Sequence, residues 1–302
     1  MFSNVVSQVA ILLVLMLVGV LLTKFGVLKE NAVKSMTDLV LYTVTPCVII
    51  KSFVRKFEMS ALKNLLISFL IAFLAHILFI VLSRIIFRTK DESKRKVLQF
   101  AVVFSNCGYM SLPLQEALLG DNGIFYGSSF IAIFNLFVWS YGILLMSGDK
   151  KYLSAKKMII NPGIIGLVLG LIVFLFSVPL PKVIYEPISY MASLNTPLPM
   201  IIIGYHLTKS KIFKGRAGLL AIAVRLVVFP LLALAIMYLC GVRGDMFVSV
   251  VISCCAPTAA ITTMFADKFG AETALSVNLV SLSTIISLIT IPLIVTLAQM
   301  LS

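Results

Sequence analysis

The chain has 302 residues, of which 60% are apolar and 12% are charged. An ordinary soluble domain has roughly a quarter of its residues charged, so this composition excludes a soluble protein and indicates a polytopic membrane protein. The formal net charge of +13 does not indicate a nucleic-acid-binding protein, because the basic residues fall in short loops between apolar runs.

Apolar runs of about the 20 residues needed to cross a bilayer recur along the whole chain. The first, Val5–Leu22, has neither a basic leader nor an A-x-A cleavage site, which predicts a retained span rather than a signal peptide. We expect ten spans: Val5–Thr23, Met36–Phe53, Leu62–Phe87, Val97–Leu119, Ile124–Met146, Pro162–Val178, Val183–Leu207, Ala217–Cys240, Phe247–Phe265 and Thr273–Met300.

Most lysines and arginines outside these spans lie in the odd-numbered loops, and the loop of residues 84–96 is the most basic. The positive-inside rule therefore places the odd-numbered loops in the cytoplasm. With an even number of spans, both termini then lie on the outer side. We predict a multi-pass protein of the cell membrane with extracytoplasmic termini.

The fourth span contains a stretch, Ser105–Gly120, that an intact lipid-spanning helix does not tolerate. Gly108 loosens the helix, and Pro113 removes one amide and clashes with the carbonyl four residues earlier. Polar groups such as Asn106 and Glu116 would be unpaired in hydrocarbon, and non-helical backbone at this depth persists only in protein or beside a wet cavity. A broken helix of this kind predicts the binding site of a transporter. A proline kink capped by polar groups is the alternative.

The chain also divides into two similar halves. Pro46 in span 2 corresponds to Pro197 in span 7, and Gly120 after span 4 to Gly270 after span 9, each about 150 residues later. Pro257 then interrupts span 9 as Pro113 interrupts span 4. Because each half has five spans, the second half must be inverted relative to the first. The predicted units are a first five-helix repeat (1–146), a cytoplasmic linker (147–161) and an inverted second repeat (162–302).

The meeting of two half-helices offers free amides that attract an anion and free carbonyls that can hold a cation. For Asn106, capping of its own broken backbone is the alternative to substrate contact. The predicted substrate-contacting residues at the crossing are Asn106, Cys107, Gly108, Pro113, Pro257 and Thr258.

Two asparagines lie in mid-span and are further candidates for the binding site. We expect Asn135 in span 5 to find its hydrogen-bond partner at the crossing, and Asn278 in span 10 to reach it as well. Small polar residues at such spacing more often serve close helix packing, which is the favoured interpretation of the row in span 10. That row is Asn278, Ser281, Thr284, Ser287 and Thr290.

Ionisable residues within spans are costly and therefore functional candidates. His76 in span 3 is either a proton carrier or, as we favour, a neutral structural histidine. Arg225 in span 8 either extends to the cytoplasmic surface or offers positive charge to an anionic substrate. Glu116 either exchanges a coupling proton or is a boundary charge. Coupling to protons or to sodium therefore stays open.

Three groups of residues carry a family resemblance. They are Thr45-Pro46-Cys47 in span 2, the run Asn106–Met110 leading to Leu112-Pro113-Leu114, and Ala256–Ala259 in span 9. Together with ten spans in five plus five, they resemble the auxin efflux carrier family, in its short bacterial branch, over essentially the whole chain.

The resemblance implies an all-α inverted-repeat fold, related to bile-acid carriers and sodium/proton antiporters, in which broken helices 4 and 9 cross. Spans 1, 2, 6 and 7 would form a scaffold that dimerises, and spans 3–5 and 8–10 a mobile transport domain. It also implies organic-anion substrates such as dicarboxylates or auxin-like weak acids. Plant members have an Asn-Pro-Asn-type motif where this chain has Asn106-Cys107-Gly108, and they have a long central loop, so auxin itself is a doubtful substrate.

We therefore predict a secondary active transporter of small organic anions that works by alternating access around Asn106, Pro113 and Pro257. Its partners would be the anion, membrane lipid and a second copy of the chain through the scaffold, with no nucleic acid and no cofactor. A channel or membrane sensor on the same fold is the alternative. The sequence has no Walker loop, HExxH, GxSxG or kinase motif, which argues against an enzyme or an ATP-driven pump.

Overall fold

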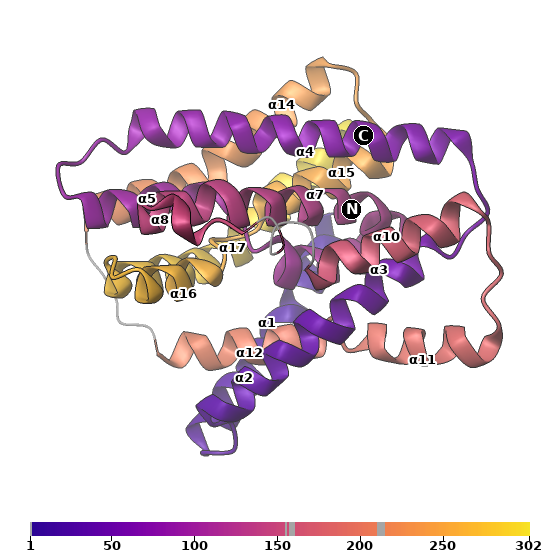
Figure 1. Cartoon of the computed structure of the whole chain (residues 1–302), viewed down its shortest axis with the longest axis horizontal. Helices are drawn as coiled ribbons and strands as arrows, with labels where there is room; N and C mark the ends of the chain where they lie inside the picture. Colours follow the sequence, from indigo (N-terminus) through magenta and orange to yellow (C-terminus); the bar gives the residue numbers. More distant parts are fainter. Residues whose placement is uncertain (1, 155, 157–160, 210–214) are drawn as a thin grey trace.

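The structure, a computed structural model, describes residues 2–154, 156, 161–209 and 215–302 (Figure 1). The predicted linker, 147–161, lies partly outside these residues. Helices make up nearly all of the described chain, and the extended pairing within it is a single bridge between Ser105 and Thr258. The helices are α1 (Phe2–Lys24), α2 (Glu30–Leu39), α3 (Thr45–Phe53), α4 (Met59–Ile86), α5 (Glu92–Val103), α6 (Leu112–Leu119), α7 (Asp121–Phe137), α8 (Ile143–Ser147), α10 (Pro162–Leu175), α11 (Lys182–Ser193), α12 (Pro197–Thr208), α13 (Arg216–Ala223), α14 (Phe229–Leu239), α15 (Gly244–Cys255), α16 (Ile261–Lys268) and α17 (Thr273–Leu301).

Short π-helical turns join some of these helices into longer rods. Four are described: η1 (Val40–Val44), η2 (Cys107–Ser111), η3 (Val138–Gly142) and η5 (Val224–Val228). Of these, η1, η2 and η5 each end two residues before a proline, at Pro46, Pro113 and Pro230. A proline lacks the amide for an i→i−4 hydrogen bond and crowds the carbonyl four residues earlier, so the helix widens just before it.

Six continuous helical segments of the described chain are long and apolar enough to cross a membrane. They are Phe2–Lys24, Glu30–Phe53, Met59–Ile86, Asp121–Ser147, Arg216–Leu239 and Thr273–Leu301. The predicted spans 4, 7 and 9 are each divided instead, into α5 and α6, α11 and α12, and α15 and α16. The described chain therefore has the architecture of an all-helical polytopic membrane protein. The ten-helix inverted repeat stays a prediction. The division of span 7 was not predicted.

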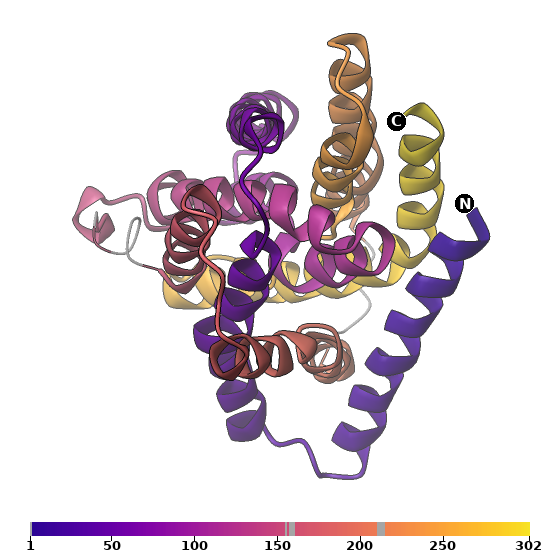
Figure 2. The same cartoon turned by 90° about the vertical axis from the view of Figure 1, so that its right-hand side faces the viewer.

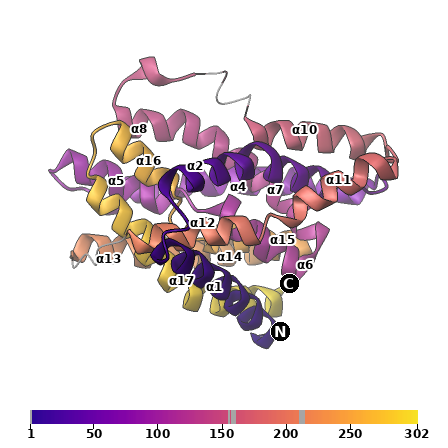
Figure 3. The ribbon, with the colours of Figure 1, turned by 90° about the horizontal axis from the view of Figure 1, so that it is seen from below.

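Glycines bring two pairs of helices into close contact. The backbone of α1 at Gly19 lies against that of α12 at Gly204, and a Cβ added to Gly204 would collide with the carbonyl oxygen of Met16. In the second pair, a Cβ on Gly166 of α10 would lie 2.7 Å from the Cα of Pro46 in α3. Small residues allow such approach where no hydrophobic effect drives helices together in lipid. Figure 3 shows α1 running beside α12.

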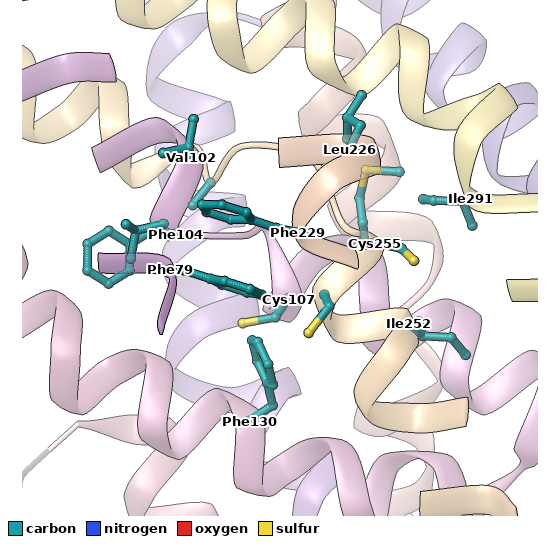
Figure 4. Packing of buried hydrophobic residues seen from close by; sticks show 14 of the residues in the cluster. Phe79, Val102, Phe104, Cys107, Phe130, Leu226, Phe229, Ile252, Cys255 and Ile291 are labelled. Atoms are coloured by element: carbon teal, nitrogen blue, oxygen red, sulfur yellow. The ribbon is translucent and has the colours of Figure 1, made fainter. Parts of the chain in front are cut away.

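The two ends of the described chain lie at the same end of the molecule, because α1 packs against α17 (Figure 2). The largest group of buried apolar side chains lies between these helices and the two broken ones, and includes the stacked rings of Phe79 and Phe229, 4.2 Å apart (Figure 4). Cys107 and Cys255, from the two breaks, belong to the same group. The breaks are thus enclosed by protein, as non-helical backbone at membrane depth requires.

Candidate functional site: the crossing of two broken helices

The two helix breaks pair with each other through their backbones. Helix α5 ends at Val103 and helix α15 at Cys255, and the extended segments that follow run antiparallel. The amide of Asn106 donates to the carbonyl of Pro257 at 2.7 Å, and the amide of Ala259 donates to the carbonyl of Phe104 at 2.9 Å. The sequence-predicted breaks in spans 4 and 9 therefore meet. The first break lies at Phe104–Asn106, before Gly108 and Pro113, and the helix then continues from η2 into α6 through Pro113.

Thr258 holds the second break in place with its own hydrogen bonds. Its hydroxyl donates to the carbonyl of Ala101 at 3.1 Å, and its amide donates to the hydroxyl of Ser283 at 3.1 Å. Ser283 was not singled out in span 10, where the predicted row ran from Asn278 to Thr290. The contact of span 10 with the crossing could not be read from spacing alone, because it depends on the depth at which α17 meets the break.

Asn106 stands at the start of η2 with its side chain unused. It is 8% exposed, and no described residue forms a hydrogen bond with its side-chain amide. The capping alternative is therefore not the arrangement seen. Gly108, two residues on, has no atom within 4 Å of where a Cβ would be, so the backbone of η2 borders open space. An amide that can both donate and accept hydrogen bonds thus has no partner beside a stretch of backbone that is not tightly packed at Gly108.

Arg225 lies at the other side of the crossing and is 1% exposed. Its Nε donates to the carbonyl of Ala256 at 3.1 Å, and its Nη1 donates to the carbonyls of Val102 at 3.0 Å and Val103 at 3.3 Å. Its Nη2 donates to the carbonyl of Cys254. The guanidinium therefore bridges the C-terminal ends of α5 and α15. Of the two alternatives for Arg225, extension to the membrane surface is wrong, because these carbonyls hold the side chain inside the protein.

The electrostatics of the crossing follow from this arrangement. The last carbonyls of a helix carry partial negative charge and the first amides partial positive charge. Arg225 covers the carbonyl ends of α5 and α15, whereas the amide ends of η2–α6 and of α16 have no such counter-charge in the described contacts.

Behind the crossing, Gln115 ties α6 to α15. Its Nε2 donates to the carbonyl of Ser249 at 2.8 Å and to the hydroxyl of Ser253 at 2.9 Å, and its side chain lies against Gly127 of α7. In the sequence, Gln115 is one of several polar residues in the broken span. The glycine and the serines that surround it lie far apart in the sequence, so the sequence alone does not show that they contact Gln115.

Replacing Gln115 by Ala should lower stability while leaving the helices present. The change removes two buried hydrogen bonds that Gln115 donates, to the carbonyl of Ser249 and the hydroxyl of Ser253, at a cost of about 1–3 kcal/mol. We expect a clearly lower midpoint in a thermal melt of the purified protein in detergent. Gln8→Ala, in the partly exposed first turns of α1, is the matched control and should melt like the unaltered protein. Equal midpoints for the two variants would contradict the role given to Gln115.

The other predicted residues lie away from the paired breaks or bond elsewhere. The side-chain nitrogen of Asn135 donates to the carbonyl of Ile131 at 2.9 Å, so the expectation that it finds its partner at the crossing is wrong. The nitrogen of Asn278 likewise donates within its own helix, to Ala274 at 2.8 Å, while its buried oxygen meets no described partner.

His76 is fully buried among the rings of Phe104, Phe130 and Phe137, of which Phe137 is stacked on it at 5.3 Å. Its Nδ1 bonds the carbonyl of Ala72 at 2.7 Å, and its Nε2 has no partner in the described structure. His76 is therefore surrounded by aromatic rings and bonded to its own helix, as is typical of a structural side chain in a packed core. The favoured structural interpretation of His76 agrees with this environment.

Glu116 forms an ion pair with Lys51, with Nζ and Oε1 3.5 Å apart. The pair joins α6 of the broken span to α3. Glu116 also lines a cleft of about 180 Å³ between α1 and α6, together with Gln8, Pro113 and Thr196. In the described part of the chain, no three His, Cys, Asp or Glu side chains are placed to bind a metal ion together.

Comparisons with known proteins agree with this membrane architecture. The model of a family described as "Membrane transport protein" matches residues 4–295. An uncharacterized transporter of Methanothermobacter thermautotrophicus is 26% identical over 301 residues, which are 97% of this chain and 98% of the relative. A second uncharacterized transporter, from Methanocaldococcus jannaschii, is 27% identical over 298 residues, 94% of this chain and 96% of the relative.

Proposed function

Because the chain belongs to the membrane transport protein family, we propose that it is a secondary transporter of small organic anions that works by alternating access around the crossing. Membership confirms the resemblance to the auxin efflux carriers that the motifs carried. The observation that supports an anionic substrate is that a positive side chain neutralises the carbonyl ends of the broken helices, while no negative side chain neutralises their amide ends in the described contacts. Arg225 neutralises the two carbonyl ends, and the amide end of η2 keeps its partial positive charge at Asn106.

Asn106 and the first amides of η2 are the groups that would bind a carboxylate. Backbone amides at a helix start are ready donors to an anion, and the backbone of Asn106 is held in place by its hydrogen bond to the carbonyl of Pro257. The open space at Gly108 leaves the backbone accessible to a small ligand. A dicarboxylate or another small weak acid is the substrate class that this arrangement suits.

Alternating access requires two bodies that move against each other. In our proposal the closely packed pairs α1–α12 and α3–α10 belong to the scaffold, and the crossing moves with α4–α8 and α13–α17. Polar links between the bodies in the described structure include Lys51 with Glu116, and Arg55 with Asn122, which in turn donates to Asp245. Links of this kind, at the rim rather than the centre, can open once in each cycle.

Counterflow of labelled malate and other small carboxylates in proteoliposomes tests this proposal. We expect saturable exchange, reduced at least tenfold by Asn106→Ala and unaffected by Asn31→Ala on the exposed face of α2. Non-saturating flux would favour the channel alternative. A folded protein that exchanges no carboxylate would contradict the organic-anion assignment.

A further inference from the structure

Arg225 is unusual because its guanidinium is fully buried and yet forms hydrogen bonds only with backbone carbonyls. In the described structure no carboxylate forms an ion pair with it, and Phe79 lies across it with its ring centre 5.9 Å from Cζ. Burying a charge without a counter-ion is costly unless other groups compensate it. Here the compensation comes from carbonyl oxygens of Val102, Val103, Cys254 and Ala256.

These carbonyls belong to the last turns of two broken half-helices. Such carbonyls have no partner within their own helix and carry the negative end of the helix dipole. In transporters with broken helices, carbonyls at half-helix ends are the groups that coordinate a coupling cation. In this chain, the guanidinium already occupies the carbonyls that an ion would need.

We propose that Arg225 is a built-in cation that replaces an exchangeable metal cation at the crossing, so that transport needs no sodium ion bound there. Arginine suits this task because its planar group has five donors in a fixed fork and stays charged at any working pH. Nε and the two Nη atoms reach both helix ends at once. Lysine, with a compact ammonium group, cannot span both ends in the same way.

The π-helical turn η5 explains how the arginine is placed. The turn precedes Pro230 and widens the rod formed by α13 and α14 at residues 224–228. Arg225 lies in this turn, and its side chain reaches the two breaks from there. The positive charge is thus part of the fold rather than a transported species. The crossing stays neutralised at its carbonyl ends whether or not substrate is present.

Thermal melting of variants tests the structural half of the proposal, which does not depend on transport. Arg225→Ala should melt well below the unaltered protein, and millimolar guanidinium should restore part of the difference. Arg243→Ala is the matched control, because Arg243 also donates to backbone carbonyls, of Tyr238 and Val242, but is exposed. Guanidinium should not raise its midpoint. An Arg225→Ala protein that melts like the unaltered one would overturn the proposal, as would equal responses of the two variants to guanidinium.

A second pair of variants applies if Arg225→Ala yields no folded protein. Arg225→Lys keeps the charge and Arg225→Met keeps a comparable length without it. We expect the lysine variant to fold with a reduced midpoint and the methionine variant to be less stable still. A methionine variant as stable as the lysine variant would show that charge is not what the site requires.

The sodium half of the proposal rests on the proposed transport function and is measured on the unaltered protein. Counterflow should be the same in sodium chloride and in choline chloride, with equal conditions on both sides of the vesicle. A loss of tenfold or more without sodium would overturn the built-in cation. Absence of exchange in both media would instead contradict the organic-anion assignment, and the melting experiments would still decide the role of Arg225.

Discussion

A short covalent cross-link between residues 51 and 116 is expected to stop anion exchange completely. Lys51 on α3 and Glu116 on α6 lie 3.5 Å apart at their charged atoms, across the boundary between the proposed scaffold and the proposed moving body. If the crossing must move past α3 in every cycle, a fixed link there holds the protein in one state. The experiment uses Lys51→Cys/Glu116→Cys in a background without the native cysteines, a bifunctional thiosulfonate reagent, and counterflow before and after reduction.

A cross-link inside the proposed moving body provides the control. Ser68 on α4 and Ser129 on α7 have their hydroxyls 2.8 Å apart, and cysteine is close to serine in size. Ser68→Cys/Ser129→Cys, oxidised to a disulfide, should leave exchange intact. Full transport with residues 51 and 116 linked would contradict alternating access across this boundary and favour a channel with fixed helices.

Gly204→Val is expected to destroy the close pairing of α1 and α12. An added Cβ would collide with the carbonyl of Met16 and lie 2.9 Å from the Cα of Gly19, so a backbone must move. Overpacking a core already costs about 1–3 kcal/mol when side chains can adjust, and here no side chain is present to yield. We expect little monodisperse protein in size-exclusion chromatography and a strongly lowered melting midpoint.

Gly163→Ala tests whether this effect belongs to the contact or to glycine replacement in general. A Cβ at Gly163 meets Asn161 at 3.5 Å and Asn135 at 3.6 Å, which are ordinary contacts. The alanine should be tolerated, and helix propensity favours it by up to about 1 kcal/mol. If Gly204→Val were as stable as Gly163→Ala, the close approach of α1 and α12 would be wrong.

The breaks in spans 4 and 9 could be predicted because each is visible locally. Asn106, Gly108 and Pro257 stand within apolar runs, and each violates the requirements of a lipid-exposed helix on its own. Their meeting in space followed from the correspondence of the two halves. The third division, between α11 and α12 at Leu194–Thr196, was not predicted, although Pro197 follows it directly.

The partners of individual side chains could not be predicted in the same way. Arg225 bonds carbonyls near residues 102 and 255, which depends on the depth and rotation of three separate helices. Asn135 was expected to bond to a distant residue, but its side-chain nitrogen donates to a carbonyl one turn earlier in its own helix. For Glu116 the sequence left a coupling-proton site and a boundary charge open, and its ion pair with Lys51 depends on the common depth of the two residues in the fold.

The pairing of the two breaks also constrains how the protein is made. The amide of Asn106 and the carbonyl of Phe104 find their partners at Pro257 and Ala259, which the ribosome adds about 150 residues later. At ordinary rates of synthesis this is roughly 8–30 s, during which the first break lacks its backbone partners, and Arg225 is also absent for most of that time. Insertion into the bilayer must therefore shelter the first half from lipid until the second half arrives. Assembly of this membrane protein is a late, concerted event rather than the addition of finished helices one by one.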